Sequence, residues 1–295
     1  MAETRTFHAT SSAYSLPNEY GHDDCNDINQ ANNSSATEHE RLDLQTRGLN
    51  EMMHGQVFHA PVKQPSRVLE VGAGTGYVSR YLASTFPEAE VIGLDLSAVP
   101  AGEQTKAVFV QGDIMDKGIV TGPFNFVYSR MLVYGIRDWP AYISRAWDLL
   151  APGGWLEFQE VDASILFDGN DEPMYTDSAW LKEQRGALVS LGVDMGCAPK
   201  LEGYLGKQGF VDVLVRKFRW MHGPWEGHPE TLLAAKVFTQ HTSTANFEAF
   251  KRVLGHTKTA EQLEAIREQM IKEMGWSEDG KHLDFWVVCG RKPEL

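Results

Sequence analysis

A regular alternation between short β-rich runs and helical patterns, which begins at residue 67, constrains the fold of this chain more than any other feature. Each apolar run is separated from the next by a segment long enough for a crossover helix. Parallel strands need such crossovers, so the alternation predicts a parallel sheet covered by helices on both faces. The expected strands are RVLEV (67–71), EVIGLDL (90–96), AVFVQGD (107–113), FNFVYSR (124–130) and WLEFQEV (155–161).

The pattern changes after Val161. Two further runs, GFVDVLVRKF (209–218) and HLDFWVVCGRK (282–292), are typical of strands, and segments 230–250 and 259–276 between them are helical. A strand, a helical insert and a final strand predict a sheet edge that carries a cap. In this position the cap can close over the carboxyl ends of the parallel strands, where open α/β sheets bind their ligands.

The predicted organisation has three parts. Residues 1–40 are expected to form a flexible N-terminal or lid segment, because their second half has almost no large apolar side chains to offset the entropy of ordering. Residues 41–161 are expected to form the ligand-binding core. Residues 162–295 are expected to supply the remainder of the core sheet, with a helical cap at about 226–280.

Two helices are indicated with particular clarity. A helix just before the first strand is predicted by residues at amphipathic spacing, namely Leu42, Gln45, Leu49 and Met52 or Met53. A second helix is predicted before the strand at 155–161, and the sequence Pro152-Gly153-Gly154 is expected to end it.

Composition excludes several classes of partner. The 295 residues include 27 Lys and Arg against 40 Asp and Glu, a formal net charge of −13, and no segment concentrates positive charge. Nucleic acid and anionic membranes need a positive footprint, so neither is an expected partner. Cys25, Cys197 and Cys289 lack paired spacing, so neither disulfides nor a metal site is expected. Without a signal peptide or a long apolar run, we expect a cytoplasmic protein, with the nucleus left open.

The first predicted strand leads into a glycine-rich turn that holds Gly72, Gly74 and Gly76. Their spacing is G-x-G-x-G. A dinucleotide-binding turn, G-x-G-x-x-G, needs glycine at position 77, where this chain has Tyr77. The spacing therefore disfavours a pyrophosphate, although a tight turn with no ligand stays an alternative.

Carboxylates stand at the ends of three successive predicted strands. Glu70 ends the first, Asp95 ends the second and Asp113 follows the third. Each alone is typical of a loop or a helix cap, but together they line one crevice of a parallel sheet. Asp95 suits the hydroxyls of a ribose, and Asp113 suits the exocyclic amine of an adenine. An acidic lining favours a cationic ligand and repels a phosphate.

These motifs resemble those of class I S-adenosylmethionine-dependent methyltransferases. Further segments resemble a narrower group, the fungal LaeA-like methyltransferases of secondary metabolism. They are YSLPNE (14–19), ERLDLQ (40–45), DLS (95–97), SRMLVYGIRDW (129–139), LAPGGWLEFQE (150–160), GPW (223–225) and the terminal GRKP. The chain departs from that group at YSLPNEYGHDD, which lacks the usual acidic residue followed by arginine. It departs again at Thr46, where the group often has histidine.

The resemblance implies a Rossmann-like sheet of seven mostly parallel strands with an antiparallel final hairpin. It implies S-adenosyl-L-methionine as the cofactor of the core 41–161. Glu70 and the turn backbone would flank the methionine portion, and Asp95 would bind the ribose. Leu96 would pack on the adenine ring, and Asp113 with Ile114 would hold the adenine amine. Ser129 and Arg130 would lie near the sulfonium and the acceptor. The implied cofactor-binding residues are Glu70, Gly72, Ala73, Gly74, Gly76, Asp95, Leu96, Asp113, Ile114, Ser129 and Arg130.

The acceptor chemistry is less constrained. The expected reaction is in-line methyl transfer to a small natural-product molecule at O, N or S, and only an oxygen acceptor usually needs a base. His222, followed by His228, is the candidate base, and His54 and His59 flank the glycine strand. Each of these histidines has packing or capping as its alternative role.

One alternative interpretation concerns Arg130, which can instead pair with acidic residues of the neighbouring strand, namely Glu157, Glu160 or Asp162. Three other functions also stay open: a methyltransferase-like regulatory protein that works in a complex, a cofactor-bound pericyclase-type enzyme that transfers no methyl, and a nicotinamide oxidoreductase. The acceptor, the acceptor atom and the oligomeric state are not indicated by the sequence.

Overall fold

A computed structural model describes residues 35–174 and 178–294, so most of the predicted flexible segment 1–40 lies outside the described residues. None of the helices in the described ranges is both long and apolar enough to cross a membrane. The helices are α1 (Ser35–Met52), α2 (Tyr77–Thr85), α3 (Trp139–Leu149), α4 (Ala179–Ser190), α5 (Leu201–Gln208), α6 (Leu232–Val237), α7 (Ser243–Leu254) and α8 (Ala260–Met274). The strands are β1 (Arg67–Val71), β2 (Glu90–Asp95), β3 (Val108–Gln111), β4 (Phe124–Arg130), β5 (Leu150–Val161), β6 (Leu166–Phe167), β7 (Pro173–Met174), β8 (Val211–Met221) and β9 (His282–Arg291).

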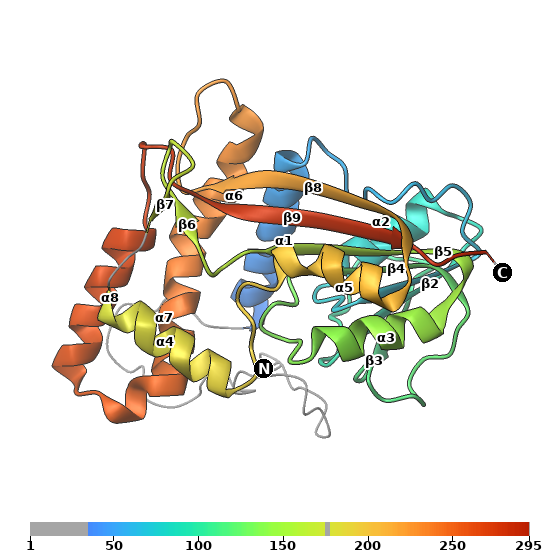
Figure 1. The fold of residues 1–295 in the computed structure, drawn as a ribbon, viewed down its shortest axis with the longest axis horizontal. Helices are drawn as coiled ribbons and strands as arrows, with labels where there is room; N and C mark the ends of the chain where they lie inside the picture. The colour runs from blue at the N-terminus through green and yellow to red at the C-terminus, as the bar shows by residue number, and fades with distance from the viewer. Residues whose placement is uncertain (1–34, 175–177, 295) are drawn as a thin grey trace.

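The strands form one sheet whose topology confirms the predicted fold. Strands β3, β2, β1, β4 and β5 are parallel neighbours in that order, and β9 pairs antiparallel with both β5 and β8. Strand β8 therefore runs parallel to β5, and the two long strands β8 and β9 form the expected final hairpin (Figure 1). The two-residue strands β6 and β7 extend this sheet at the start of β9.

The junction between α3 and β5 differs from the sequence prediction. Helix α3 begins at its cap Asp138, whose side chain accepts a hydrogen bond from an amide of the first turn, and it ends at Leu149. Pro152, Gly153 and Gly154 do not separate helix from strand but lie inside β5, which begins at Leu150. The sheet absorbs them as an irregularity, because Phe124 pairs with Leu150 whereas Phe126 pairs with Trp155.

Register places helices on both faces of the sheet. Glu70, Tyr128 and Glu157 are neighbours across β1, β4 and β5, so their side chains share one face. Glu70 contacts Ser79 of α2 on this face. On the opposite face, Phe158 of β5 packs against the aromatic rings of α3. The predicted covering of both faces is therefore confirmed.

Helices α4, α7 and α8 lie together at one end of the molecule (Figure 1). Trp180 of α4 packs with Phe247 and Phe250 of α7 and Met270 of α8 in a second apolar cluster. Helix α4 lies outside the segment 226–280 that the sequence marks as the cap. The apolar spacing of α4 is weak, so its packing against α7 and α8 is visible only in three dimensions.

Helix α1 packs on α6 at very short range. A Cβ added at Gly48 of α1 would stand 2.8 Å from the backbone N and Cα of Ala234 in α6. Contacts this short require glycine, because backbone atoms cannot move aside as a flexible side chain can. The helix before the glycine turn is thereby fixed to the helical group that follows β8.

Replacing Gly48 by alanine is expected to destabilise the protein. The added methyl group overlaps the α6 backbone, and overpacking of this kind typically costs about 1 to 3 kcal/mol. Gly203→Ala in α5 is the matched control, because nothing lies within 4 Å of its added Cβ. That control should gain about 0.5 to 1 kcal/mol from helix propensity. Urea unfolding measures the free energy of unfolding of both variants. Equal changes in Gly48→Ala and Gly203→Ala would contradict close packing of α1 on α6.

Candidate functional site

The turn after β1 is folded tightly and leaves one side of its backbone open. Gly72, Gly74 and Gly76 have φ angles of 78°, 56° and 79°, which side chains of L residues rarely adopt. The amides of Gly72 and Ala73 donate to the Leu94 carbonyl at 2.8 and 3.0 Å, which ties the turn to β2. A Cβ added at Gly74 would meet nothing within 4 Å. A ligand can therefore approach the backbone closely at Gly74.

Asp95, the last residue of β2, holds this turn in place. Its Oδ2 accepts a hydrogen bond from the Gly74 amide at 2.7 Å. Its Oδ1 accepts from the amide and the hydroxyl of Ser97 at 2.9 and 2.7 Å. Hydrogen bonds to a charged acceptor are strong, and this side chain is only 7% exposed. Asp95 thus stabilises the left-handed conformation of Gly74.

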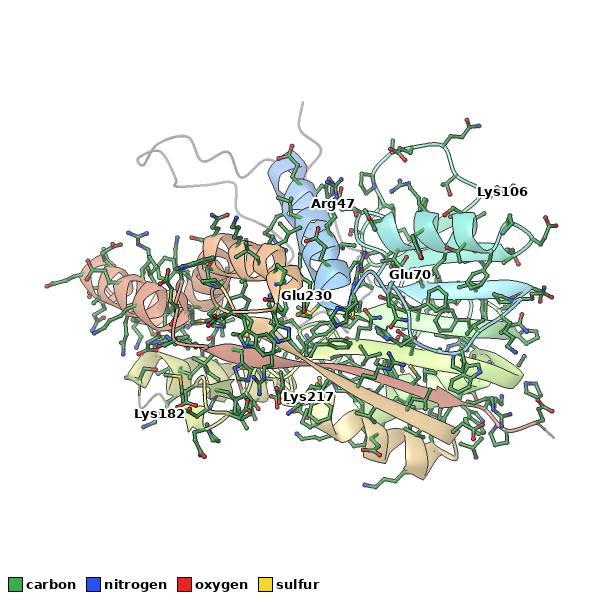
Figure 2. All side chains as sticks on the ribbon, turned by 90° about the horizontal axis from the view of Figure 1, so that it is seen from above. Arg47, Glu70, Lys106, Lys182, Lys217 and Glu230 are labelled. Atoms are coloured by element: carbon green, nitrogen blue, oxygen red, sulfur yellow. The ribbon has the colours of Figure 1, made fainter. Side chains whose placement is uncertain are left out.

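Glu70 is buried beside the turn and has a raised pKa. Burial raises the pKa to about 8, against opposing effects of the Ser79 hydroxyl and the Arg130 guanidinium, while the Asp95 charge adds to the rise. The Ser79 hydroxyl of α2 donates a hydrogen bond to Glu70. Figure 2 shows Glu70 in the interior, close to the C-terminal end of α1. At neutral pH its carboxyl group is therefore mostly protonated unless a cation lies beside it.

Arg130, at the end of β4, does not pair with the carboxylates of β5. Its Nη1 donates to Asn50 Oδ1 of α1 at 2.9 Å. Glu157 instead accepts from backbone amides of residues 59 and 60, and Glu160 accepts from those of residues 132 and 133. Asp162 accepts from the amide and hydroxyl of Ser164. The alternative interpretation of Arg130 as a partner of Glu157, Glu160 or Asp162 is wrong.

Helix α1 lies over the ends of β1 and β4. Besides the contact between Asn50 and Arg130, Asp43 Oδ1 accepts a hydrogen bond from the Thr75 hydroxyl of the glycine turn at 2.5 Å. Sequence reasoning found the helix but missed Asp43 and Asn50 as site residues. The apolar spacing that predicts α1 marks its buried side and says nothing about which polar side chains meet the turn.

The other predicted cofactor residues lie at neighbouring strand ends. Asp95 and Gln111 are paired in register, so Leu96 and Asp113 follow adjacent strands. Asp113 Oδ1 accepts from the Met115 amide at 2.9 Å. Ile114 is buried, with its carbonyl bound by Arg145. Ser129 is fully buried and lies beside Val71 in register. The structure thus brings together the ends of β1, β2, β3 and β4 with all eleven predicted cofactor residues.

The structure does not bring His222 to these strand ends. The sheet register aligns Arg130 of β4 with Arg216 of β8. His222 lies six residues beyond Arg216 along the chain, which is about 20 Å at the usual rise per residue of a strand. His222 is fully buried, with its ring centroid 4.3 Å from that of Phe238. Burial, followed by the Lys281 charge, lowers its pKa to about 3.

Two of the three remaining candidate histidines, His228 and His59, have packing partners. The His228 ring stacks on Trp225 with 3.7 Å between ring centroids, and its Nδ1 lies 3.0 Å from Glu230. His59 packs beside Phe218, and burial lowers its pKa to about 4. His54 is exposed at the end of α1. The packing role, left open by the sequence, is the one observed for His228.

Residues 46–214 match the family described as the methyltransferase domain. The methyltransferase pytC of the fungus Aspergillus terreus is 27% identical over 267 residues, which cover 87% of this chain and 81% of that protein. The methyltransferase str2 of Strobilurus tenacellus is 28% identical over 134 residues, which cover 45% of this chain and 49% of that protein. Among solved structures, phosphoethanolamine N-methyltransferase 2 of Haemonchus contortus is 19% identical with a TM-score of 0.47, covering 86% of this chain and 52% of that one.

The buried Glu70 is expected to make stability depend on pH. Folding raises the pKa of Glu70. Its contribution to the free energy of unfolding is therefore fully present below about pH 4.5 and is lost as pH rises through about 8. Glu70→Gln should remove this loss, which has a slope of up to about 1.4 kcal/mol per pH unit. Urea unfolding at several pH values between 5 and 9 measures it, with the exposed Glu88→Gln as control. Parallel curves for wild type and Glu70→Gln would contradict the raised pKa.

Proposed function

We propose that this chain, which belongs to the methyltransferase-domain family, methylates a small natural-product molecule at oxygen, nitrogen or sulfur. The methyl group comes from S-adenosylmethionine. The similar fungal proteins, which are named methyltransferases, support the reaction class. The net charge of −13 disfavours a nucleic acid. The observation that carries the proposal is the set of carboxylates at successive strand ends around an open glycine turn. The narrower resemblance to the LaeA-like group stays a prediction.

The residues around the turn fit this cofactor. S-adenosylmethionine is a cation without phosphate. Asp95 and Asp113 give an acidic lining, and a bound cation beside Glu70 would favour the ionised form of that carboxyl group. The open backbone at Gly74 leaves room for the methionine portion. We assign Asp95 to the ribose, Leu96 to the adenine ring and Asp113 with Ile114 to the adenine amine. Because Asp95 also binds the Gly74 amide, it would couple ribose binding to the shape of the turn.

The work left to the protein is mainly alignment. The cofactor supplies both the methyl group and its own leaving group. We assign Ser129 and Arg130 to the side of the site nearest the acceptor, where Asn50 of α1 binds Arg130. Good orientation of the reacting atoms is worth roughly 7 to 11 kcal/mol of the barrier. We assign no general base, since His222 is distant along β8 from these residues.

Two substitutions test the cofactor assignment. Asp95→Ala and Asp113→Ala should each weaken S-adenosylmethionine binding by about 1 to 3 kcal/mol, because each removes hydrogen bonds to a charged group. Asp116→Ala is the matched control, since Asp116 is an exposed carboxylate of the same loop whose side chain accepts only a local bond from Gly118. Calorimetry measures the affinities, and unchanged values in both variants would contradict the assignment.

Turnover tests the reaction class. With S-adenosylmethionine and a fractionated fungal small-molecule extract, the protein should release S-adenosylhomocysteine together with a product in which a methyl group replaces a hydrogen, a mass gain of one CH2 unit. Mass spectrometry detects both. Product of unchanged mass without S-adenosylhomocysteine would indicate a rearrangement instead. Stable capture of protein partners without any turnover would indicate the regulatory alternative. Tighter binding of NAD than of S-adenosylmethionine would contradict the cofactor itself.

A further inference from the structure

The connection between β4 and α3 begins with a strained turn beside the candidate site. Met131, its first residue, has a φ angle of 56°, which residues with a Cβ rarely adopt. Strain of this kind persists only where the surroundings hold the backbone, and it is frequent at ligand sites. The next residue, Leu132, reaches the glycine turn, because a Cβ added at Gly72 would overlap its side chain. The connection therefore borders the site.

Glu160 of β5 holds this turn in place. Its Oε1 accepts a hydrogen bond from the Leu132 amide at 2.8 Å, and its Oε2 accepts from the Val133 amide at 3.1 Å. The Leu132 carbonyl in turn accepts from the amides of Gly135 and Ile136 at 2.7 and 3.0 Å. Glu160 is fully buried, so these bonds are not exchanged with water. The side chains that follow Leu132 are thereby carried on a fixed backbone.

Tyr134 of this connection combines an apolar environment with partial exposure. In the part of the chain that the structure describes, burial raises the pKa of Tyr128, Tyr134 and Tyr142, and of these three Tyr134 alone is half-buried. Its pKa rises to about 12, so the hydroxyl keeps its proton at neutral pH. That hydroxyl forms no hydrogen bond with any described residue, whereas the Tyr128 hydroxyl donates to a neighbouring side chain at 2.9 Å. Tyr134 therefore offers an aromatic ring and an available donor.

We propose that Tyr134 contacts the acceptor and that Glu160 is the positioning residue that holds its turn. This inference deepens the proposed function and rests on it. An aromatic ring packs against flat apolar surfaces, and the tyrosine hydroxyl can donate one hydrogen bond. An environment that disfavours the charged form of a phenol also disfavours a charged group on a ligand. The acceptor that fits Tyr134 is a flat molecule, uncharged at this contact, with a hydroxyl or carbonyl oxygen.

Two neutral probes, 1-naphthol and naphthalene, test the contact in the complex with S-adenosylhomocysteine. They share a ring system, and only naphthol has an oxygen. Tyr134→Phe should weaken naphthol binding roughly 3- to 10-fold and leave naphthalene within about twofold, as expected for one neutral hydrogen bond. Tyr134→Ala should weaken both probes about 10-fold or more, because the ring contact is lost as well. Fluorescence titration measures the affinities. Tyr81→Phe and Tyr81→Ala, at an exposed tyrosine of α2, should change neither.

Glu160→Gln tests the positioning role. It should weaken both probes about 3- to 10-fold, because the carboxamide presents one oxygen where the carboxylate presents two. In the Tyr134→Ala background the same change should have no further effect, since Glu160 acts through Tyr134. Glu157→Gln is the matched control, because Glu157 is equally buried and also accepts from two backbone amides, those of residues 59 and 60. That control should leave probe affinity within about twofold.

The outcomes separate this inference from the proposed function. Absence of naphthol binding by the wild-type complex, or equal naphthol affinity in wild type and both Tyr134 variants, would overturn the acceptor contact alone. Additive effects of Glu160→Gln and Tyr134→Ala would overturn the positioning role. Failure of wild type to bind S-adenosylmethionine would instead contradict the proposed function. Thermal unfolding checks the fold of each variant, and Glu160→Asp replaces Glu160→Gln in the same cycle if the latter does not fold.

Discussion

The hydrogen bond between the Asp95 carboxylate and the Gly74 amide is the contact on which the rest of the site depends. It joins the end of β2 to a turn that begins at the end of β1, and it stabilises a backbone conformation that only glycine adopts readily. Once this turn is fixed, α2 begins directly after it, and Ser79 of that helix meets Glu70. The position of the buried acid thus follows from the position of the turn.

The second constraint is the cover that α1 provides. Thr75 belongs to the glycine turn and Arg130 to the end of β4, and one helix binds both of them through Asp43 and Asn50. Below these contacts, Glu157 binds the amides of residues 59 and 60, and Gln159 binds the Val57 carbonyl. The chain from α1 to β1 is therefore attached to the sheet along its length. Glu157 and Glu160 accept hydrogen bonds from backbone amides, whereas Arg130 donates to the neutral side chain of Asn50.

Much of the fold could be predicted from the sequence, because period-two apolar runs and glycine turns act locally. Strand β4 was predicted to the residue, and the carboxylates at residues 70, 95 and 113 were placed correctly at strand ends. What failed depends on contacts between distant segments. Pro152 looks like a helix stop, yet the following backbone can bend into a strand because Lys292 bonds to Gly153 and Gly154. The partner of Arg130 lies 80 residues earlier in the chain. No rule of sequence spacing connects Asn50 with Arg130.

The close approach of Gly48 to Ala234 joins two segments that lie far apart in the sequence, and it does so on the helix that contacts the glycine turn. Helix α6 touches neither the glycine turn nor β4 among the contacts described above, but it bears on the helix that touches both. A substitution in α6 that displaces α1 by a fraction of an ångström therefore displaces Asp43 and Asn50 as well. The geometry of the glycine turn and of Arg130 can therefore change through residues that contact neither of them.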